Sequence, residues 1–243
     1  MNSSSTGRPS LHLDNAAASV PSPMALEAFN KAAETFFANQ EGAGLSSTLS
    51  AEAVAEASRS LAVSLLRDPA AGTFWVNTGT DALAVAVDAA VALRKGPLLC
   101  SDVEHPALSC AIEKAAAANN LPFRRVNIRP DGQLDLAQLE TLLDEKVSLL
   151  AIHHVQAETG ARQDLLAIRA LLNKFAPKAL FLSDTTQSAF KLDIPWEPAH
   201  LDFATVSGAK IGCPSGAALL FRKDPRRFLE KHLHALRSVE HKV

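Results

Sequence analysis

The chain has 243 residues, of which 47% are hydrophobic and 21% charged, the composition of a globular protein that can bury a sizeable core. The 24 basic and 26 acidic residues give a formal net charge of -2 without a basic stripe, which argues against nucleic acid as a partner. Three cysteines without a CxxC pair fit a reducing compartment, and no apolar run approaches a membrane-spanning length, so we expect a cytoplasmic protein with no membrane partner.

The first ten residues, MNSSSTGRPS, are polar and lack the apolar centre of a signal peptide. We therefore predict a disordered tail over residues 1–10 and one domain over residues 11–243. Beyond the tail, Ala/Leu/Glu-rich stretches with helical spacing alternate with short apolar runs. In chain order we expect helices at 23–37 and 50–66, a strand at 73–76, a helix at 80–94, a strand at 97–101, a helix at 106–119, a strand at 123–128, a helix at 135–143, a strand at 147–154, a helix at 164–175, and strands at 179–183, 203–207 and 217–221.

This alternation predicts an α/β fold, because strands separated by helices require crossover connections. The sheet is expected to be mostly parallel, with helices on both faces. Pro/Gly-containing stretches such as RPDGQ (129–133) and IPWEPAH (194–200) are interpreted as turns and not as domain linkers.

Polar side chains stand at or just after the ends of five predicted strands. In open parallel sheets, ligands bind at the edge where the carboxyl ends of the strands lie. The five stretches are NTGTD (77–81), DVEH (102–105), QAETG (156–160), DTTQ (184–187) and SGAK (207–210). Each has an ordinary structural interpretation by itself, such as an Asx turn or a helix cap. Together they predict one site.

The chemistry of these groups is informative. A turn entering a helix offers free N–H groups to a phosphate. A carboxylate can keep a ring nitrogen protonated, an imidazole can lie on a flat ring, and a lysine can form a Schiff base with an aldehyde. Pyridoxal 5'-phosphate has these requirements, so the sequence predicts a pyridoxal-phosphate site.

Six blocks of the sequence, in order, resemble the class V aminotransferase family and most closely its cysteine desulfurases. LHLDNAAAS (11–19) is similar to the family's opening LDNAAT, NTGTDA to its TSGATE turn, and DVEHPAL to its EH motif. VQAETGARQDL resembles VNNETGxxQPI, SDTTQSAFKLDI resembles VDxxQxxGKxPID, and SGAKIGCPSG resembles SGHKxxGPKG. The resemblance covers roughly residues 11 to 221 and implies the large domain of a fold-type I enzyme.

The resemblance also assigns roles to single residues. It implies that Lys210 is the Schiff-base lysine and that His105 stacks on the cofactor ring, both as catalytic residues. The remaining cofactor contacts implied are Asp184 to the ring nitrogen, Gln187 to the ring hydroxyl, Ser207 to the phosphate, and the turn residues Thr78, Gly79 and Thr80.

Four positions depart from the family pattern, one of which is Ser215 in place of the lysine of the GPKG block. Asp81 stands where the family has a phosphate-binding threonine, and a carboxylate beside a phosphate is repulsive. Its ordinary interpretation is a first-turn acid that the helix dipole favours, and we predict that it fills the place of the phosphate. Ala157 and Ala209 replace a second asparagine and a histidine, and each replacement loses a polar contact.

The family's small C-terminal domain is expected to be absent from this chain, and with it the nucleophilic cysteine and the arginine that holds the substrate carboxylate. Cys100, Cys110 and Cys213 do not fall at that cysteine's place. Two functions therefore stay open, together with a third possibility, that the chain is a gene fragment. The first is a pyridoxal-phosphate enzyme that acts on a small amino acid, cysteine by resemblance, and passes sulfur to an acceptor protein; the second is an inactive binding partner. The resemblance also implies a homodimer.

A metal site is not predicted. His153 and His154 adjoin on an expected strand, so their side chains point to opposite faces and do not share an ion. Cys100, His105 and Cys110 match no zinc-ligand spacing.

Overall fold

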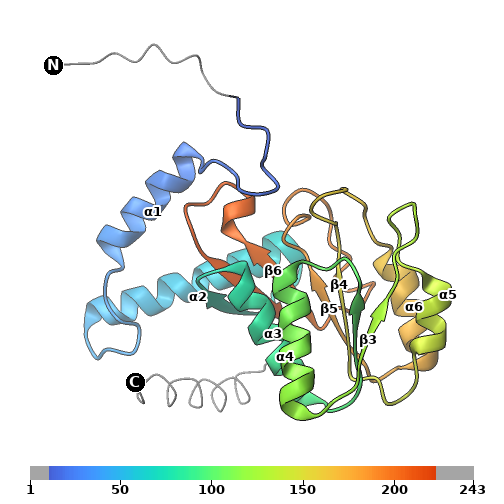
Figure 1. Cartoon of the computed structure of the whole chain (residues 1–243). Coiled ribbons are helices and arrows are strands. Elements are labelled where there is room, and N and C mark those ends of the chain that lie inside the picture. The colour runs from blue at the N-terminus through green and yellow to red at the C-terminus, as the bar shows by residue number, and fades with distance from the viewer. Residues whose placement is uncertain (1–10, 223–243) are drawn as a thin grey trace.

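The computed structural model describes residues 11–222 as a twisted sheet between layers of helices (Figure 1). The tail predicted over residues 1–10 lies outside the described residues, as do residues 223–243. The strands are β1 (Gly72–Val76), β2 (Leu98–Ser101), β3 (Phe123–Val126), β4 (Leu149–His153), β5 (Leu180–Asp184), β6 (Phe203–Ser207) and β7 (Ala217–Phe221). The helices are α1 (Pro23–Thr35), α2 (Leu45–Leu66), α3 (Gly79–Leu93), α4 (Pro106–Asn119), α5 (Leu136–Leu142) and α6 (Leu165–Phe175), with a 3₁₀ turn at Gly208–Lys210.

The seven strands form one sheet in the order β1-β7-β6-β5-β4-β2-β3. The neighbouring pairs from β6 to β3 are parallel, and only β7 runs antiparallel to its two neighbours. The prediction of a mostly parallel α/β sheet is confirmed, and so are the seven strands and six helices, with shifts of a few residues at their ends. The largest shift is in α2, which begins at Leu45 and not at residue 50.

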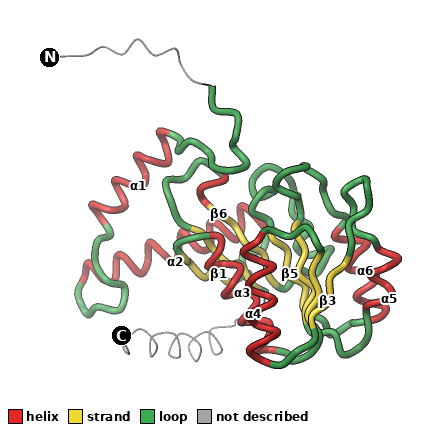
Figure 2. Tube along the Cα trace, viewed as in Figure 1, coloured by secondary structure: helices red, strands yellow, loops and turns green. Residues whose placement is uncertain are grey.

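Each face of the sheet has its own apolar core, because successive strand residues point to opposite faces. On one face, α3 and α4 pack Val87 and Ile112 against residues such as Leu98 and Ala151. On the other face, α2, α5 and α6 contribute, for example, Leu65 and Ile168. Figure 2 shows the strands enclosed between these helices. The apolar runs recognised in the sequence are therefore strands covered on both sides.

Helix α1 differs from the other helices, since none of its residues is buried (Figure 1). It begins with Ser22 as N-cap and Pro23 in the first turn, two ordinary start signals. The segment before it lies against the site loop, because Ser19 N donates to Ala209 O at 2.7 Å and Ser22 N to Gly212 O at 2.9 Å. No helix in the described part of the chain is long and apolar enough to span a membrane.

Candidate cofactor site

The loops that follow the parallel strands surround a cavity of about 1090 Å³, which we call the edge cavity. Its walls come from the loops after β1, β2, β4, β5 and β6 and from the segment of residues 11–22 before α1, which we call the arm. Seven of the eight residues implied by the resemblance line it: Gly79, Thr80, His105, Asp184, Gln187, Ser207 and Lys210. Strand ends that are distant in sequence are thus brought together, as expected for a parallel sheet.

Lys210 stands at the end of the 3₁₀ turn that follows β6. The turn is tight, because a Cβ atom on Gly208 would lie 2.7 Å from the carbonyl oxygen of Ser215. The Lys210 ammonium donates to the carbonyl of Ala17, and Gln187 Nε2 donates to the carbonyl of Ala16 at 2.9 Å. The arm therefore lies against two of the residues expected to hold a cofactor.

Asp184 ends β5 and is 8% exposed. Its Oδ1 accepts hydrogen bonds from Thr186 N and from Thr205 Oγ1, both at 3.0 Å. These two bonds fix the carboxylate, and no described residue donates to Oδ2. One carboxylate oxygen is therefore free for a ligand in the edge cavity.

The N-terminus of α3 carries a reciprocal capping box between Thr78 and Asp81. Asp81 N donates to Thr78 Oγ1 at 3.1 Å, and the Asp81 carboxylate accepts from Thr78 N at 3.0 Å and Thr78 Oγ1 at 2.7 Å. Thr78 consequently does not line the edge cavity, and its hydroxyl is already used.

Other donors remain beside this cap. Gly79 lies beside Ser207, since a Cβ atom on Gly79 would be in ordinary van der Waals contact with Ser207 Cβ at 3.4 Å. The hydroxyls of Thr80 and Ser207 make no hydrogen bond to a described residue, and the first amides of α3 have no partner within the helix. This end of the cavity therefore offers unpaired donors at a helix N-terminus, which suits a phosphate.

His105 is the N-cap of α4 and also lines the edge cavity. Its Nδ1 accepts from Ala107 N at 3.1 Å, so the helix start fixes the orientation of the ring. The two interpretations of this residue, as a backbone-bonded helix cap and as a wall of a ligand site, are therefore compatible.

Next to His105 lies a buried hydrogen-bond network of Glu104, His153 and Gln163, which was not predicted from the sequence. Glu104 accepts from Ser101 Oγ at 2.6 Å and from His153 N at 3.0 Å, and its Oε1 lies 2.9 Å from His153 Nδ1. His153 Nε2 lies 3.1 Å from Gln163 Nε2. Glu104 directly precedes His105 in the DVEHPAL motif, and this adjacency was the sequence signal that could have indicated its place beside the cavity.

The cysteines lie elsewhere, since none of the three lines the edge cavity. Burial, and secondly the neighbouring Glu104, raise the pKa of the Cys100 thiol to about 12, so this thiol is a poor nucleophile. Within residues 11–222, no cluster of His, Cys, Asp and Glu is suited to hold a metal ion. His153 lines the edge cavity and His154 lines a different one, which agrees with the prediction that their side chains point to opposite faces of the sheet.

The donor set fits pyridoxal 5'-phosphate. An amine, a carboxylate with one free oxygen and a group of unpaired phosphate donors share one cavity of sufficient size. Ala157 lines the cavity where the resemblance implies an asparagine, so one polar contact is missing. The fold and the cavity together define an α/β protein with a lysine-bearing cavity at the carboxyl edge of its sheet.

The class V aminotransferase model matches residues 11–238, and the chain belongs to this family. It is 39% identical over 105 residues to the cysteine desulfurase IscS of Tolumonas auensis, covering 43% of this chain and 26% of that protein. It is 26% identical over 235 residues to the mitochondrial cysteine desulfurase of Drosophila melanogaster, covering 94% of this chain and 50% of that protein.

Among solved structures, the fold is similar to that described as SspA in complex with cysteine. The TM-score is 0.79 at 22% identity, with 88% of this chain and 62% of that chain covered. The chain spans a quarter to a half of the length of these two curated relatives.

Proposed function

We propose that this chain binds pyridoxal 5'-phosphate in the edge cavity and acts with it on the amine of a small amino acid, with cysteine as the first substrate to test. The observation that carries the proposal is that Lys210 and Asp184 share the cavity with unpaired donors of Gly79, Thr80 and Ser207. The names of the relatives support cysteine as the substrate, with sulfur transfer as the reaction.

Lys210 would hold the aldehyde carbon of the cofactor covalently, and the free oxygen of Asp184 would face the protonated ring nitrogen. Gln187 would contact the ring hydroxyl, and His105 would lie along the ring face. The Thr80 and Ser207 hydroxyls and the first amides of α3 would hold the phosphate. When bound, the cofactor supplies an electron sink for a carbanion at the substrate Cα.

The chain's own residues prepare this chemistry. Lys210 must leave the Ala17 carbonyl before its amine can react, and a protonated amine must first lose its proton. Gln187 must likewise release the Ala16 carbonyl to reach a ring hydroxyl. Binding therefore requires the arm to move or to exchange these two hydrogen bonds.

Sulfur transfer needs a thiol that the edge cavity does not contain, because no cysteine of the described residues lines it. We propose that an external thiol, on an acceptor protein or a second polypeptide, takes the sulfur. The homodimer implied by the resemblance is part of the same proposal.

The test is to add pyridoxal 5'-phosphate to the purified chain and record an absorbance band near the visible range, then to reduce with borohydride and map the modified peptide. We expect the cofactor on the peptide that contains Lys210. Lys210→Ala should remove the modification, whereas Lys191→Ala, which removes an exposed lysine outside the edge cavity, should not. A folded protein without modification at Lys210 would contradict the proposal.

A second candidate, a binding partner without a cofactor, is favoured by the Asp81 cap and by the arm contacts of Lys210 and Gln187. In that case the edge cavity is a structural remnant. The same experiment separates the two functions, because the remnant gives no fixed cofactor although the fold is intact.

A further inference from the structure

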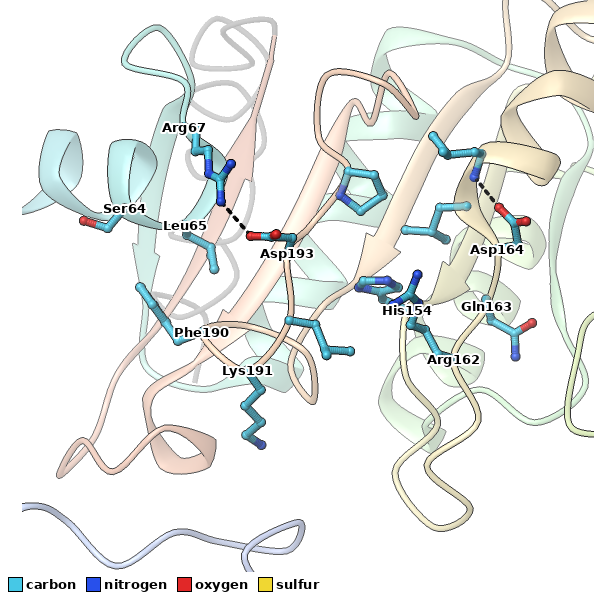
Figure 3. Close-up of a pocket in the computed structure, with 14 residues that line it drawn as sticks. Ser64, Leu65, Arg67, His154, Arg162, Gln163, Asp164, Phe190, Lys191 and Asp193 are labelled. Atoms are coloured by element: carbon cyan, nitrogen blue, oxygen red, sulfur yellow. Dashed lines mark hydrogen bonds and ion pairs between the residues drawn. The ribbon is translucent and has the colours of Figure 1, made fainter.

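A second cavity, of about 820 Å³, lies on the α2 and α6 side of the sheet, and we call it the lateral cavity. It lies between the C-terminal end of α2, the N-terminal end of α6 and the loop of residues 190–195 (Figure 3). None of the residues that line it lines the edge cavity. The class V cofactor site therefore does not account for it.

One buried side chain of this cavity has an unsatisfied polar atom. His154 is 2% exposed, and its Nδ1 has no hydrogen-bond partner among the described residues. Burying a polar group without a partner costs roughly 1–3 kcal/mol, so such atoms require an explanation. Burial, and secondly the charge of Arg162, lower the pKa of the imidazole to about 4, so the ring is neutral near pH 7 and has one donor and one acceptor nitrogen.

Arg162 is held beside this ring by backbone hydrogen bonds. Val155 and Arg162 form an antiparallel bridge, and Gln163 N donates to His154 O at 2.9 Å. Figure 3 shows the Arg162 side chain next to the His154 imidazole. Its guanidinium pairs with no acid among the described residues, although the cavity has two acids.

Both of those acids are already engaged. Asp193 pairs with Arg67 at 2.8 Å, and Asp164 accepts from Leu166 N and Ala167 N, both at 3.0 Å, as the N-cap of α6. The helix amides are thus satisfied from within the chain. With Lys191 also unpaired, three cations face two anions in this lining, a formal charge of 3 − 2 = +1 with His154 neutral.

The rest of the lining is mainly apolar. Leu65 and Leu165 are buried, whereas Leu166, Phe190 and Leu192 are 49%, 51% and 40% exposed. These side chains add an apolar part to a lining that also carries charged and polar groups, and small-molecule sites combine both kinds of surface.

We propose that the lateral cavity is a second binding site, for a small organic anion whose apolar body packs against Leu65, Leu165 and Leu192 and whose anionic group pairs with Arg162. His154 completes the site by a hydrogen bond from its neutral ring to the ligand. The site is independent of the cofactor proposal, because it shares no lining residue with the edge cavity.

The probe is 2-naphthoate, an apolar ring system with one carboxylate, compared with the neutral 2-naphthalenemethanol. Equilibrium dialysis or calorimetry should show one saturable naphthoate site and weaker binding of the alcohol. Arg162→Ala should weaken naphthoate binding by ~10-fold or more, the loss of one charge-assisted pair, and should leave alcohol binding nearly unchanged. Lys178→Ala, which removes an exposed cation outside the cavity, controls for net charge.

His154→Phe separates a ligand role from a structural one. An unpartnered polar ring that serves only packing can be replaced by an apolar ring without loss of stability. We therefore expect His154→Phe to keep or raise the thermal midpoint while it weakens naphthoate binding several-fold.

Three results would overturn the inference. They are no saturable naphthoate binding at millimolar concentration, equal affinity in Arg162→Ala and wild type, and complete competition by pyridoxal 5'-phosphate that the Lys210→Ala change abolishes. The last result would place the naphthoate in the edge cavity. Failure of Lys210 to bind the cofactor would leave the lateral site unaffected, so the two proposals fail separately.

Discussion

Asp81 lies in the first turn of α3, within the stretch that resembles the family's cofactor turn, and its carboxylate is hydrogen-bonded within the chain. The sequence placed a carboxylate where a phosphate is expected to bind, and the structure shows that the carboxylate turns back to cap α3 through Thr78. The cap stabilises the helix and uses three donors from which a phosphate could accept, namely Thr78 N, Thr78 Oγ1 and Asp81 N. The negative charge also remains at the helix N-terminus, where it opposes a phosphate.

We expect Asp81→Thr to raise the affinity for pyridoxal 5'-phosphate by ~3- to 10-fold, because it removes the repulsion and frees the Thr78 hydroxyl. The dissociation constant can be measured by absorbance titration. Glu140→Gln on α5, which removes a carboxylate that lines neither cavity, is the matched control. Unchanged or weaker binding in Asp81→Thr would contradict this account of the position.

His154 gives a second prediction at the scale of one residue. Its pKa is about 4 in the folded protein, whereas an unfolded chain protonates histidine near its ordinary value of about 6.5. Between these two values the unfolded state binds more protons, so the contribution of His154 to stability is lost as the pH falls through this window, by roughly 1.4 kcal/mol per pH unit.

We expect the stability of His154→Phe relative to wild type to grow by up to ~3 kcal/mol as the pH is lowered from about 7 to 4. Urea unfolding at several pH values measures it, and the difference between the two proteins cancels the other titrating groups. A difference that does not change with pH would show that folding does not lower the pKa of His154.

At the scale of elements, the Glu104 carboxylate links the end of β2 to the end of β4. It accepts from the β4 backbone at His153 N and from Ser101 Oγ at the end of β2, and it pairs with the His153 ring. Both side chains of the pair are almost fully buried, at 6% and 0% exposure. This connection holds the strand ends from which His105 and the β4 loop enter the edge cavity.

Glu104→Ala should destabilise the protein by about 3 kcal/mol, because it leaves a buried imidazole and a backbone amide without their acceptor. Glu104→Gln keeps an oxygen acceptor and should cost less. Chemical denaturation with a constant m-value would provide the comparison. An equal loss in both variants would indicate that shape, and not hydrogen bonding, is what matters at this position.

At the scale of the whole molecule, α1, the segment that follows it and the start of α2 expose large apolar side chains. Met24, Phe29 and Phe37 are 79%, 50% and 75% exposed, and Leu45 is 77% exposed. A helix of 13 residues without buried side chains is marginal in water, so it requires a partner surface. We expect a second copy of this chain to cover it, in line with the homodimer that the resemblance implies.

Sedimentation over a range of concentrations should therefore detect a dimer. Phe29→Ser combined with Phe37→Ser should weaken the dimer at least ~10-fold, because two exposed aromatic side chains are removed from the interface. Val63→Ser, at a 43% exposed position of α2, is the control for a general loss of apolar surface. A monomer at all concentrations, or equal effects of the two changes, would exclude this surface as the dimer interface.

The sequence by itself determined the fold class and grouped seven of the residues that line the edge cavity. Apolar runs of strand length between helical stretches define a covered parallel sheet, and the carboxyl ends of its strands meet at one edge, so Lys210, Asp184 and His105 could be grouped before any coordinates. The antiparallel direction of β7 was not predictable from the sequence, because an apolar run such as AALLF is compatible with both parallel and antiparallel pairing.

Only the tertiary structure decided which polar groups are free. The resemblance implies Thr78 as a cofactor contact, but the Thr78 hydroxyl already donates to the Asp81 carboxylate and accepts from Asp81 N. Glu104 and His153 are 49 positions apart in the chain, and the lateral cavity is lined by residues from separate helices and loops. A local sequence pattern does not indicate contacts of this kind. The order of the strands and the hydrogen bonds that each side chain already makes are properties of the packed chain. They determine which groups Lys210 and Arg162 contact and which of their donors remain unpaired.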